Sequence, residues 1–481
     1  MNRLRSPFSG ALALSVLALS FVLAFPPSGR AADTARRGKT ETALDRYVAK
    51  PDASFTWKKA AELSDSSGTA YVLDVVSHTW LTSAEVNRTE WRHWLTIIKP
   101  ANLAHSTALL FISGGSNKPG NPPKPSRELI EVAQATRSVV AEIRMVPNQP
   151  ITFQGDNKPR TEDDLIAYSW DQFLRNGDER WPARLPMTKS AVRAMDAVTA
   201  FLASDEGGKA TVDTFVVSGG SKRGWTTWTT AAVDRRVVAI APIVIDVLNT
   251  EVSMDHHFRA YGFFAPSVGD YVRHNIMEWI GTPESKALYA IEDPFSYRDR
   301  LTMPKLLINA CGDQFFLPDS SQFYFDQLSG EKFLRYIPNT DHGMKNTDAY
   351  QTLSAWHHAI LHRTPLPRFS WKRADDGTLT VTAKTKPTSV LFWQATNPAA
   401  RDFRLETLGP VWTSTSVEAT GDTYAAKVTT PAAGWTAYFM ELTFALGADT
   451  PLKLTTDVSV TPNTYPFPSP NAPKPKGFLS K

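Results

Sequence analysis

The sequence predicts an α/β protein whose mostly parallel sheet has helices on both faces, followed by an all-β segment. Short apolar runs alternate with segments of helical periodicity over roughly residues 40–365, as in parallel strands joined by helical crossovers. One of these runs ends in the glycine-rich turn Gly219-Gly220-Ser221. From about residue 367 the pattern changes to short alternating strands separated by Pro, Gly and Asn.

The N-terminus has the organisation of a secretory signal peptide. Arg3 and Arg5 precede an apolar run over residues 10–25, and small residues around Ala31 form a cleavage site. We expect residues 1–31 to be removed and the mature protein to be periplasmic or secreted; an uncleaved membrane anchor is the alternative. No later stretch approaches the roughly 20 apolar residues that span a bilayer, so no membrane association is expected after cleavage.

Charge and cysteine content narrow the possible partners. The leader contains Arg3, Arg5 and Arg30 but no acidic residue, so its removal lowers the net charge from +4 to +1. A nearly neutral protein has no electrostatic basis for binding nucleic acid. The single cysteine, Cys311, excludes an intramolecular disulfide and is expected to be buried.

The elements of the α/β part follow from apolar periodicity. Residues 107–113 (TALLFIS) are too short and too apolar for anything but a buried strand. Val192, Met195, Val198 and Leu202 recur at helical spacing, which predicts a helix over 188–202. Further strands are predicted at 71–76, 91–98, 139–143, 215–217, 237–245, 306–308 and 333–337, and a helix at about 126–137.

An insertion at about 247–303 breaks this alternation and is rich in aromatic residues and histidine. Because it follows the strand next to the Gly219-Gly220-Ser221 turn, we expect a helical cap over that turn, with His256 and His257 in the wall of a substrate pocket. Adjacent histidines point in different directions on a helix, and no spaced Glu or Cys completes a ligand set. We therefore expect no metal and no cofactor.

The last part of the chain predicts a β-sandwich over residues 367–465 and a proline-rich tail over 466–481. Asp376-Gly377 is a strong turn signal before the alternating run 379–383. Short strands follow at 390–393, 425–428 and 438–442. The density of proline predicts a disordered tail.

Ser221 is the candidate nucleophile. A β-branched run leads into two glycines, the serine and then a helix-like segment, the arrangement that exposes a serine hydroxyl on a sharp strand-to-helix turn. A serine hydroxyl needs an adjacent base to become nucleophilic. The alternative, Gly114-Gly115-Ser116, also follows a buried strand, but no clean helix starts directly behind it. We assign Gly115 and Ser116 to an oxyanion hole, with the Lys222 N–H as a second donor.

His342 and Asp313 are the candidate base and orienting acid. Both lie in turns that follow predicted strands, and the order Ser, Asp, His is that of an α/β-hydrolase triad. The acid fixes the imidazole tautomer and stabilises the imidazolium. Asp246, at the end of the strand 237–245, remains a rival acid. Asp341 is more plausibly structural, and His357 and His358 lie on a predicted helix, so they are weaker candidates for the base.

A family resemblance rests on three segments. Gly219 to Trp228 (GGSKRGWTTW), Ala241 to Asn249 (APIVIDVLN) and Asn309 to Phe316 (NACGDQFF) closely resemble the PhoPQ-activated pathogenicity-related protein family of exported bacterial proteins. The resemblance covers about residues 40–465. It implies an α/β-hydrolase fold and the triad Ser221, Asp313 and His342.

One departure from common esterases concerns Arg223. The position two after the serine is usually small, whereas here it is arginine and Gly224 follows. Glucuronoyl esterases look similar in this respect, so Arg223 could bind a substrate carboxylate through its two-pronged guanidinium, with Trp225 also near the substrate. The alternative is that Arg223 pairs with a structural acid.

The leading functional prediction is an exported serine hydrolase that acts through an acyl-enzyme, on an ester more readily than on an amide. A peptidase on the same fold is one alternative, so the expected partner is a small-molecule or peptide substrate. A second alternative is a non-catalytic secreted binding or virulence-related protein on a hydrolase scaffold. Folds of this kind host many functions, so the function has to be inferred from the residues of the site.

Overall fold

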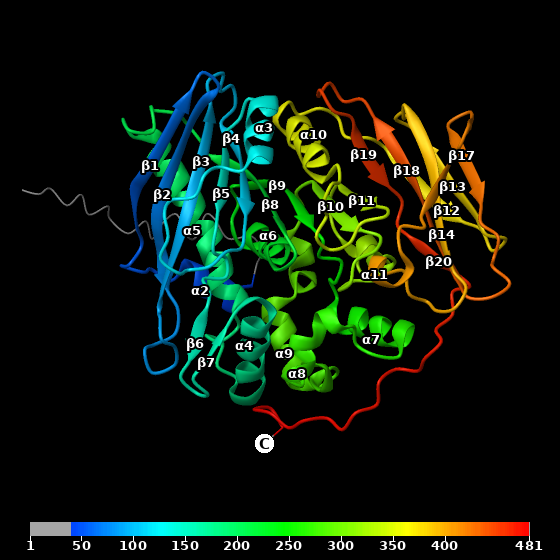
Figure 1. The fold of residues 1–481 in the computed structure, drawn as a ribbon, viewed down its shortest axis with the longest axis horizontal. Coiled ribbons are helices and arrows are strands. Elements are labelled where there is room, and N and C mark those ends of the chain that lie inside the picture. Colours follow the sequence, from blue (N-terminus) through cyan, green and yellow to red (C-terminus); the bar gives the residue numbers. More distant parts are fainter. Residues whose placement is uncertain (1–39, 481) are drawn as a thin grey trace, which may run out of the picture.

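The computed structural model describes residues 40–480, so the predicted signal peptide lies outside the described residues. The central parallel strands lie in the order β5-β4-β8-β9-β10-β11, as Figure 1 shows. These strands are β4 (Thr107–Ile112), β5 (Val140–Ile143), β8 (Thr214–Gly220), β9 (Val237–Ile243), β10 (Lys305–Ala310) and β11 (Lys332–Ile337). The antiparallel strands β1 (Thr56–Asp65), β2 (Gly68–Thr79) and β3 (Glu90–Pro100) extend the sheet at one edge.

Helices cover both faces of this sheet, which confirms the predicted fold class. On one face lie α2 (Ala43–Ala49), α5 (Arg184–Ala203) and α6 (Lys222–Val233), and on the other lie α3 (Arg127–Thr136) and α10 (Ala349–Leu361). Successive side chains of β8 point to opposite faces of the sheet, so both faces need a cover. Phe215 and Val217 enter one hydrophobic core, whereas Val216 enters the core on the opposite face. Parallel strands buried on both faces therefore have nearly continuous apolar sequences.

The cap contains the predicted insertion and a second segment that the sequence analysis did not identify. The insertion forms α7 (Thr250–Tyr261), α8 (Gly269–Arg273), α9 (Pro283–Glu292) and the short helices η1 (Pro266–Val268), η2 (Ile276–Trp279) and η3 (Pro294–Arg300). Helix α4 (Glu162–Asn176) contacts α8, α9 and η2, and it follows the hairpin of β6 (Ile151–Phe153) and β7 (Lys158–Arg160). Two segments far apart in the sequence thus lie together below the sheet in Figure 1.

The C-terminal strands form two sheets, but one of them continues the central sheet. Strand β11 pairs with β19 (Leu452–Thr455), and the order continues through β18 (Trp435–Phe444), β14 (Ser389–Asn397) and β15 (Thr413–Ser416), with β20 (Ser459–Thr461) beside β18. The second sheet contains β12 (Phe369–Arg373), β13 (Thr378–Ala383), β17 (Thr423–Lys427) and β16 (Ala419–Thr420), and the short helix α11 (Leu405–Leu408) follows β14.

The join between the two parts rests on an ion pair as well as on strand pairing. Leu334 of β11 pairs with Thr455 of β19, and the buried Arg335 lies 2.5 Å from a Glu441 carboxylate oxygen on β18. One sheet of the C-terminal strands therefore extends the sheet of the α/β domain, and side chains of both C-terminal sheets share one hydrophobic core, as in the predicted sandwich. Edge pairing leaves no local signal, because it depends on which strand edges are left open.

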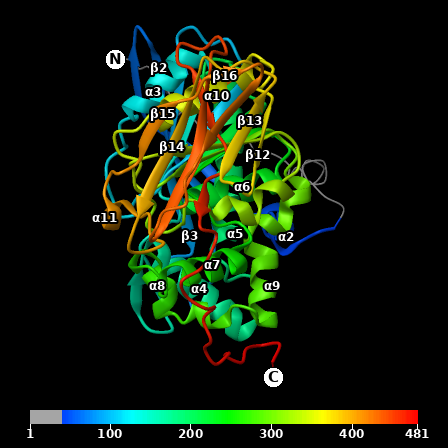
Figure 2. The same cartoon turned by 90° about the vertical axis from the view of Figure 1, so that its right-hand side faces the viewer.

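The proline-rich tail is ordered by specific contacts, unlike the predicted disorder. It leaves the β-strands, passes α7 and ends against the cap, as Figure 2 shows. The Phe478 ring packs edge-on against Phe173 of α4 at 5.5 Å, and the Leu479 N–H and Ser480 hydroxyl donate to a Glu284 carboxylate oxygen of α9 at 3.0 and 2.6 Å. These contacts at the C-terminal end hold the tail in place, although it has no regular secondary structure.

Candidate active site

Ser221 occupies a sharp turn between β8 and α6. Its backbone has φ 56° and ψ −126°, a conformation that L-residues rarely adopt, and its N–H donates to the Ile243 carbonyl at 2.8 Å. A Cβ at Gly219 would lie 2.9 Å from the Arg223 carbonyl oxygen, and a Cβ at Gly224 would lie 2.9 Å from the Gly219 oxygen. Glycine is therefore required on both sides of the serine for the strand and helix to approach.

His342 and Asp313 are in direct contact. Nδ1 of His342 lies 2.8 Å from Oδ2 of Asp313, whose other oxygen accepts the Phe315 N–H at 2.7 Å. The His342 side chain retains 16% of its accessible surface, whereas that of Asp313 retains 3%. This arrangement holds the imidazole by one nitrogen and leaves the other for a second partner.

The rival acid, Asp246, has other partners. Its two carboxylate oxygens accept hydrogen bonds from the Tyr324 and Tyr336 hydroxyls at 2.5 and 2.6 Å. Burial, reinforced by the charge of Asp313, raises the pKa of Asp246 to about 7 against the two tyrosine hydrogen bonds.

Ser221 and the His342 region face a shared pocket. The Phe315 ring lies 4.4 Å from the His342 ring, and Phe315, Phe316 and Ser221 all line this pocket. Within residues 40–480 no hydrogen bond joins Ser221 to His342. Hydrogen bonds between a catalytic nucleophile and its base often form fully only when substrate binds. The absence of this bond is therefore compatible with Ser221 as nucleophile and His342 as base.

The predicted oxyanion donors lie at the start of α6 and after β4. Lys222 is the first residue of α6, where backbone N–H groups have no partner within the helix. Gly115 has φ 134°, outside the range of most L-residues, and would place a Cβ 3.5 Å from Met145. Ser116 is exposed in a loop, its hydroxyl accepts the Lys118 N–H at 3.3 Å, and α3 begins only at Arg127. Ser116 thus lacks the strand-to-helix turn of Ser221.

Arg223 and Lys222 are paired with acidic residues of α4. Nη2 of Arg223 lies 2.7 Å from a Glu162 carboxylate oxygen, and Nζ of Lys222 lies 2.9 Å from the other and 3.1 Å from an Asp163 oxygen. Burial acts to raise the pKa of Glu162, but these two cations lower it to about 2. Gly114 makes room for the guanidinium, because a Cβ there would lie 2.4 Å from Nη2 of Arg223.

His256 and His257 lie inside the cap instead of in the pocket wall, contrary to the expectation from sequence. His256 contacts Asp319 at 2.9 Å and the Tyr465 hydroxyl at 2.8 Å, and His257 accepts the Ala265 N–H at 2.9 Å. Burial lowers the pKa of His257 to about 3, so its ring is neutral. Among the described residues, neither His256 nor His257 lines the pocket beside Ser221, whereas Trp225 does.

The pocket beside Ser221 has mainly apolar and aromatic walls. The aromatic insertion contributes several residues to this wall, as predicted, whereas Trp170 and Asp163 of α4 and Arg184 of α5 were not expected there. The acidic run Glu162-Asp163-Asp164 after Thr161 is a helix-start signal that could have revealed α4. Its pairing with Lys222 has no local signal, because the two segments are about sixty residues apart.

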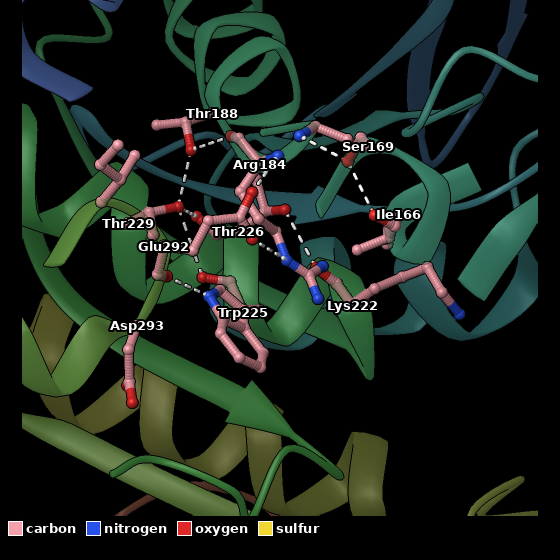
Figure 3. A network of polar contacts seen from close by, with 12 residues as sticks. Ile166, Ser169, Arg184, Thr188, Lys222, Trp225, Thr226, Thr229, Glu292 and Asp293 are labelled. Atoms are coloured by element: carbon pink, nitrogen blue, oxygen red, sulfur yellow. Dashed lines mark hydrogen bonds and ion pairs between the residues drawn. The ribbon is translucent and has the colours of Figure 1, made fainter. Parts of the chain in front are cut away.

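A buried polar network holds the first turn of α6, as Figure 3 shows. Arg184 donates from Nη1 to the Lys222 carbonyl at 3.2 Å, and its backbone N–H donates to a Glu292 carboxylate oxygen at 3.2 Å. The Trp225 indole N–H donates to the Glu292 carbonyl at 2.5 Å. Since Glu292 ends α9, the network connects the cap to the helix behind Ser221.

The fold and site define an α/β-hydrolase-fold protein with a serine at the strand-to-helix turn. Residues 44–404 match the family described as PhoPQ-activated pathogenicity-related protein, and the chain belongs to this family. It is also 36% identical over 461 residues to autocrine proliferation repressor protein A of Dictyostelium discoideum, covering 89% of this chain and 92% of that protein.

Solved structures with a similar arrangement have low sequence identity. Acetyl xylan esterase 1 of Thermoanaerobacterium sp. aligns with a TM-score of 0.46 and 15% identity over 70% of this chain and 99% of that one. An acylaminoacyl peptidase of Pyrococcus horikoshii aligns with a TM-score of 0.39 and 11% identity over 63% and 49%. Among residues 40–480, no helix has the length and apolar character needed to cross a membrane.

Proposed function

We propose that the protein is an exported serine hydrolase that cleaves esters through an acyl-enzyme on Ser221. The observation that carries this proposal is the strained turn at Ser221, which lines the same pocket as Phe315, the residue whose ring packs on His342 of the His342–Asp313 pair. Strain of this kind persists only where surrounding structure holds it, and it exposes the hydroxyl. Export rests on the signal-peptide pattern of residues 1–31.

In this mechanism Nε2 of His342 takes the Ser221 hydroxyl proton while the serine oxygen attacks the ester carbonyl carbon. The Lys222 N–H, with Gly115 or Ser116 N–H, stabilises the negative oxygen of the tetrahedral intermediate. Its collapse breaks the bond to the alcohol, which leaves with the proton from His342. Water then gives a proton to His342 and attacks the acyl carbon, and collapse of the second tetrahedral intermediate breaks the bond to the Ser221 oxygen, which takes the proton back from His342 as the acid is released. Asp313 holds the imidazole and stabilises its charged form.

Esters are favoured over peptides because the charged groups in the pocket wall are already paired with one another. Lys222 pairs with Glu162 and Asp163, and the buried Arg184 lies 3.5 Å from a Glu292 oxygen. Binding a peptide terminus would require one of these groups to leave its partner, at the cost of an unpaired buried charge. Arg223 is engaged in the same way, so it serves to hold Glu162 instead of a substrate carboxylate.

A non-catalytic signalling role is the second candidate, and the name of the Dictyostelium relative, a proliferation repressor, supports it. A fluorophosphonate probe applied to the mature protein, to Ser221→Ala and to Ser116→Ala separates the two. Labelling lost only in Ser221→Ala supports the hydrolase. A folded wild type that does not react supports the signalling role. Labelling lost only in Ser116→Ala would move the nucleophile to the loop after β4.

A further inference from the structure

Six aromatic side chains surround the space next to Ser221. They come from the sheet domain, α4 and the cap, and the aliphatic side chains between them come mainly from the cap. The aromatic residues are Trp170, Trp225, Tyr271, Tyr289, Phe315 and Phe316. Pockets with such apolar and aromatic walls bind ligands chiefly by removing apolar surface from water.

The charged groups of this wall are paired within the protein, Arg184 with Glu292 and Lys222 with Asp163. Asp163 accepts from Lys222 at 3.1 Å with one oxygen and from the Tyr271 hydroxyl at 3.1 Å with the other. The guanidinium of Arg184 stacks on Trp225 at 4.4 Å and keeps only 3% of its side chain exposed. A charged substrate group would therefore enter without a free counter-ion, which is costly in an apolar site.

From these two observations we infer that the pocket receives an uncharged aromatic or branched apolar group of the ester. The inference rests on the proposed hydrolase function and specifies its substrate class. Such a group is either the acyl part or the alcohol, because Ser221 lines the pocket and the scissile bond has one group on each side. Acetyl esters of small alcohols would leave this space unfilled and gain little binding from it.

The test measures kcat/KM of the wild type in two series. The acyl series compares 4-nitrophenyl acetate with 4-nitrophenyl benzoate, and the alcohol series compares ethyl acetate with 2-phenylethyl acetate. We expect a preference of about 10-fold or more for the bulky apolar group in at least one series, the size of effect that burial of such a group supplies. A preference for the small substrate in both series overturns the inference.

Charge is tested with a matched pair. Acetylcholine and 3,3-dimethylbutyl acetate have the same shape, and only the first is cationic. The neutral ester is expected to be the better substrate by about 10-fold or more, whereas a preference for acetylcholine would mean that the aromatic wall binds cations and would overturn the inference.

Two valines of the cap provide a matched control. Val268 lines the pocket and is 3% exposed, whereas Val272, four residues later, is 40% exposed and lies outside the described lining. Val268→Phe is expected to abolish the preference for bulky esters, and Val272→Phe to leave it unchanged. Met277→Phe, at a partly buried lining position, serves as a second filling variant if Val268→Phe does not fold.

A binding measurement separates failure of this inference from failure of the hydrolase proposal. In Ser221→Ala, ethyl benzoate is expected to quench the fluorescence of the pocket tryptophans, and the Val268→Phe change is expected to remove the quenching. Quenching without any fluorophosphonate labelling would support the pocket and reject the hydrolase. Labelling at Ser221 without quenching, together with preference for small esters, would reject the pocket inference alone.

Discussion

The two buried aspartates that follow β9 and β10, Asp246 and Asp313, differ in what they contact. Asp313 bonds His342, while Asp246 accepts from two tyrosine hydroxyls. The sequence placed both at the ends of neighbouring strands and could not separate them, because the direction of a side chain at a strand end depends on the loop that follows. The contacts favour Asp313 as the residue that orients the base.

Matched amide substitutions test this assignment. Asp313→Asn is expected to lower kcat/KM for a 4-nitrophenyl ester by about 10⁴-fold, because an amide favours the wrong imidazole tautomer. Asp246→Asn, which keeps an acceptor for a tyrosine hydroxyl, is expected to change it by less than about 10-fold. A reversed ranking would make Asp246 the functional acid.

Contacts between side chains from distant segments of the chain could not be predicted from the sequence. Ser221, Asp313 and His342 follow apolar runs whose carboxyl ends meet at one edge of a parallel sheet, so their neighbourhood could be predicted. Glu162 and Arg223 belong to different segments, and only the fold brings them together. His256 looked suited to a pocket wall, but Asp319 and Tyr465 hold it elsewhere.

Among the elements, α6 has the most demanding environment, because its first turn has to hold Ser221. Arg184 and Glu292 connect this turn to α5 and to the end of α9, with both side chains at most 3% exposed. Such a pair contributes little net stability, but loss of one partner leaves a buried charge behind.

At pH 8, above the pKa of about 7 to which burial raises the Glu292 carboxyl, Glu292→Gln is therefore expected to lower the free energy of unfolding by about 3 kcal/mol in urea denaturation, because the Arg184 charge loses its counter-ion. Glu131→Gln on α3 is the control, since its pair with Arg127 is exposed, and we expect a loss below about 0.5 kcal/mol. Equal losses in the two variants would show that the buried network does not stabilise the protein.

Helices and strands could be predicted where their apolar periodicity is visible within one segment of the sequence. The strand 107–113, the helix 188–202 and the cap insertion follow from periodicity or from its interruption, and β4, α5 and α7 to α9 occupy these regions. Helix α4 is absent from the predicted elements, and its only strong local signal is the acidic run after Thr161. The β11–β19 pairing was missed because edge contacts are non-local.

At the scale of the whole molecule, the C-terminal tail joins the β-strands to the cap. Gly177 and Gly477 allow close approach at its far end: a Cβ at Gly177 would lie 2.6 Å from the Phe478 ring, and one at Gly477 would lie 2.2 Å from the Leu174 carbonyl oxygen. The tail thereby holds α4 and α9, which carry pocket residues Trp170 and Tyr289.

Phe478→Ala is expected to destabilise the protein by about 1–3 kcal/mol, the amount associated with exposing a packed aromatic ring, and to lower the melting temperature. Leu479→Ala is the neighbouring control, because Leu479 is 53% exposed. If neither substitution changes the melting temperature, the tail does not contribute to the stability of the cap.

The raised pKa of Asp246 predicts a pH dependence of global stability. A carboxyl whose folded pKa is about 7 binds its proton more tightly than in the unfolded chain, where the pKa is about 3.9. Its contribution is complete below the unfolded value and is lost as pH rises towards 7. Between pH 5 and 7 the unfolding free energy of the wild type should fall more steeply than that of Asp246→Asn, by up to about 1.4 kcal/mol per pH unit. Parallel curves would contradict this.

The central claim is that Ser221 becomes acylated during turnover. The most direct measurement is the mass of the peptide containing Ser221 after an acid quench of the wild type with 4-nitrophenyl benzoate. A benzoyl addition on Ser221 is expected in the wild type and should be absent from Ser221→Ala. Ester turnover with the acyl group on another residue, or with no adduct under conditions that trap the intermediate, would contradict it.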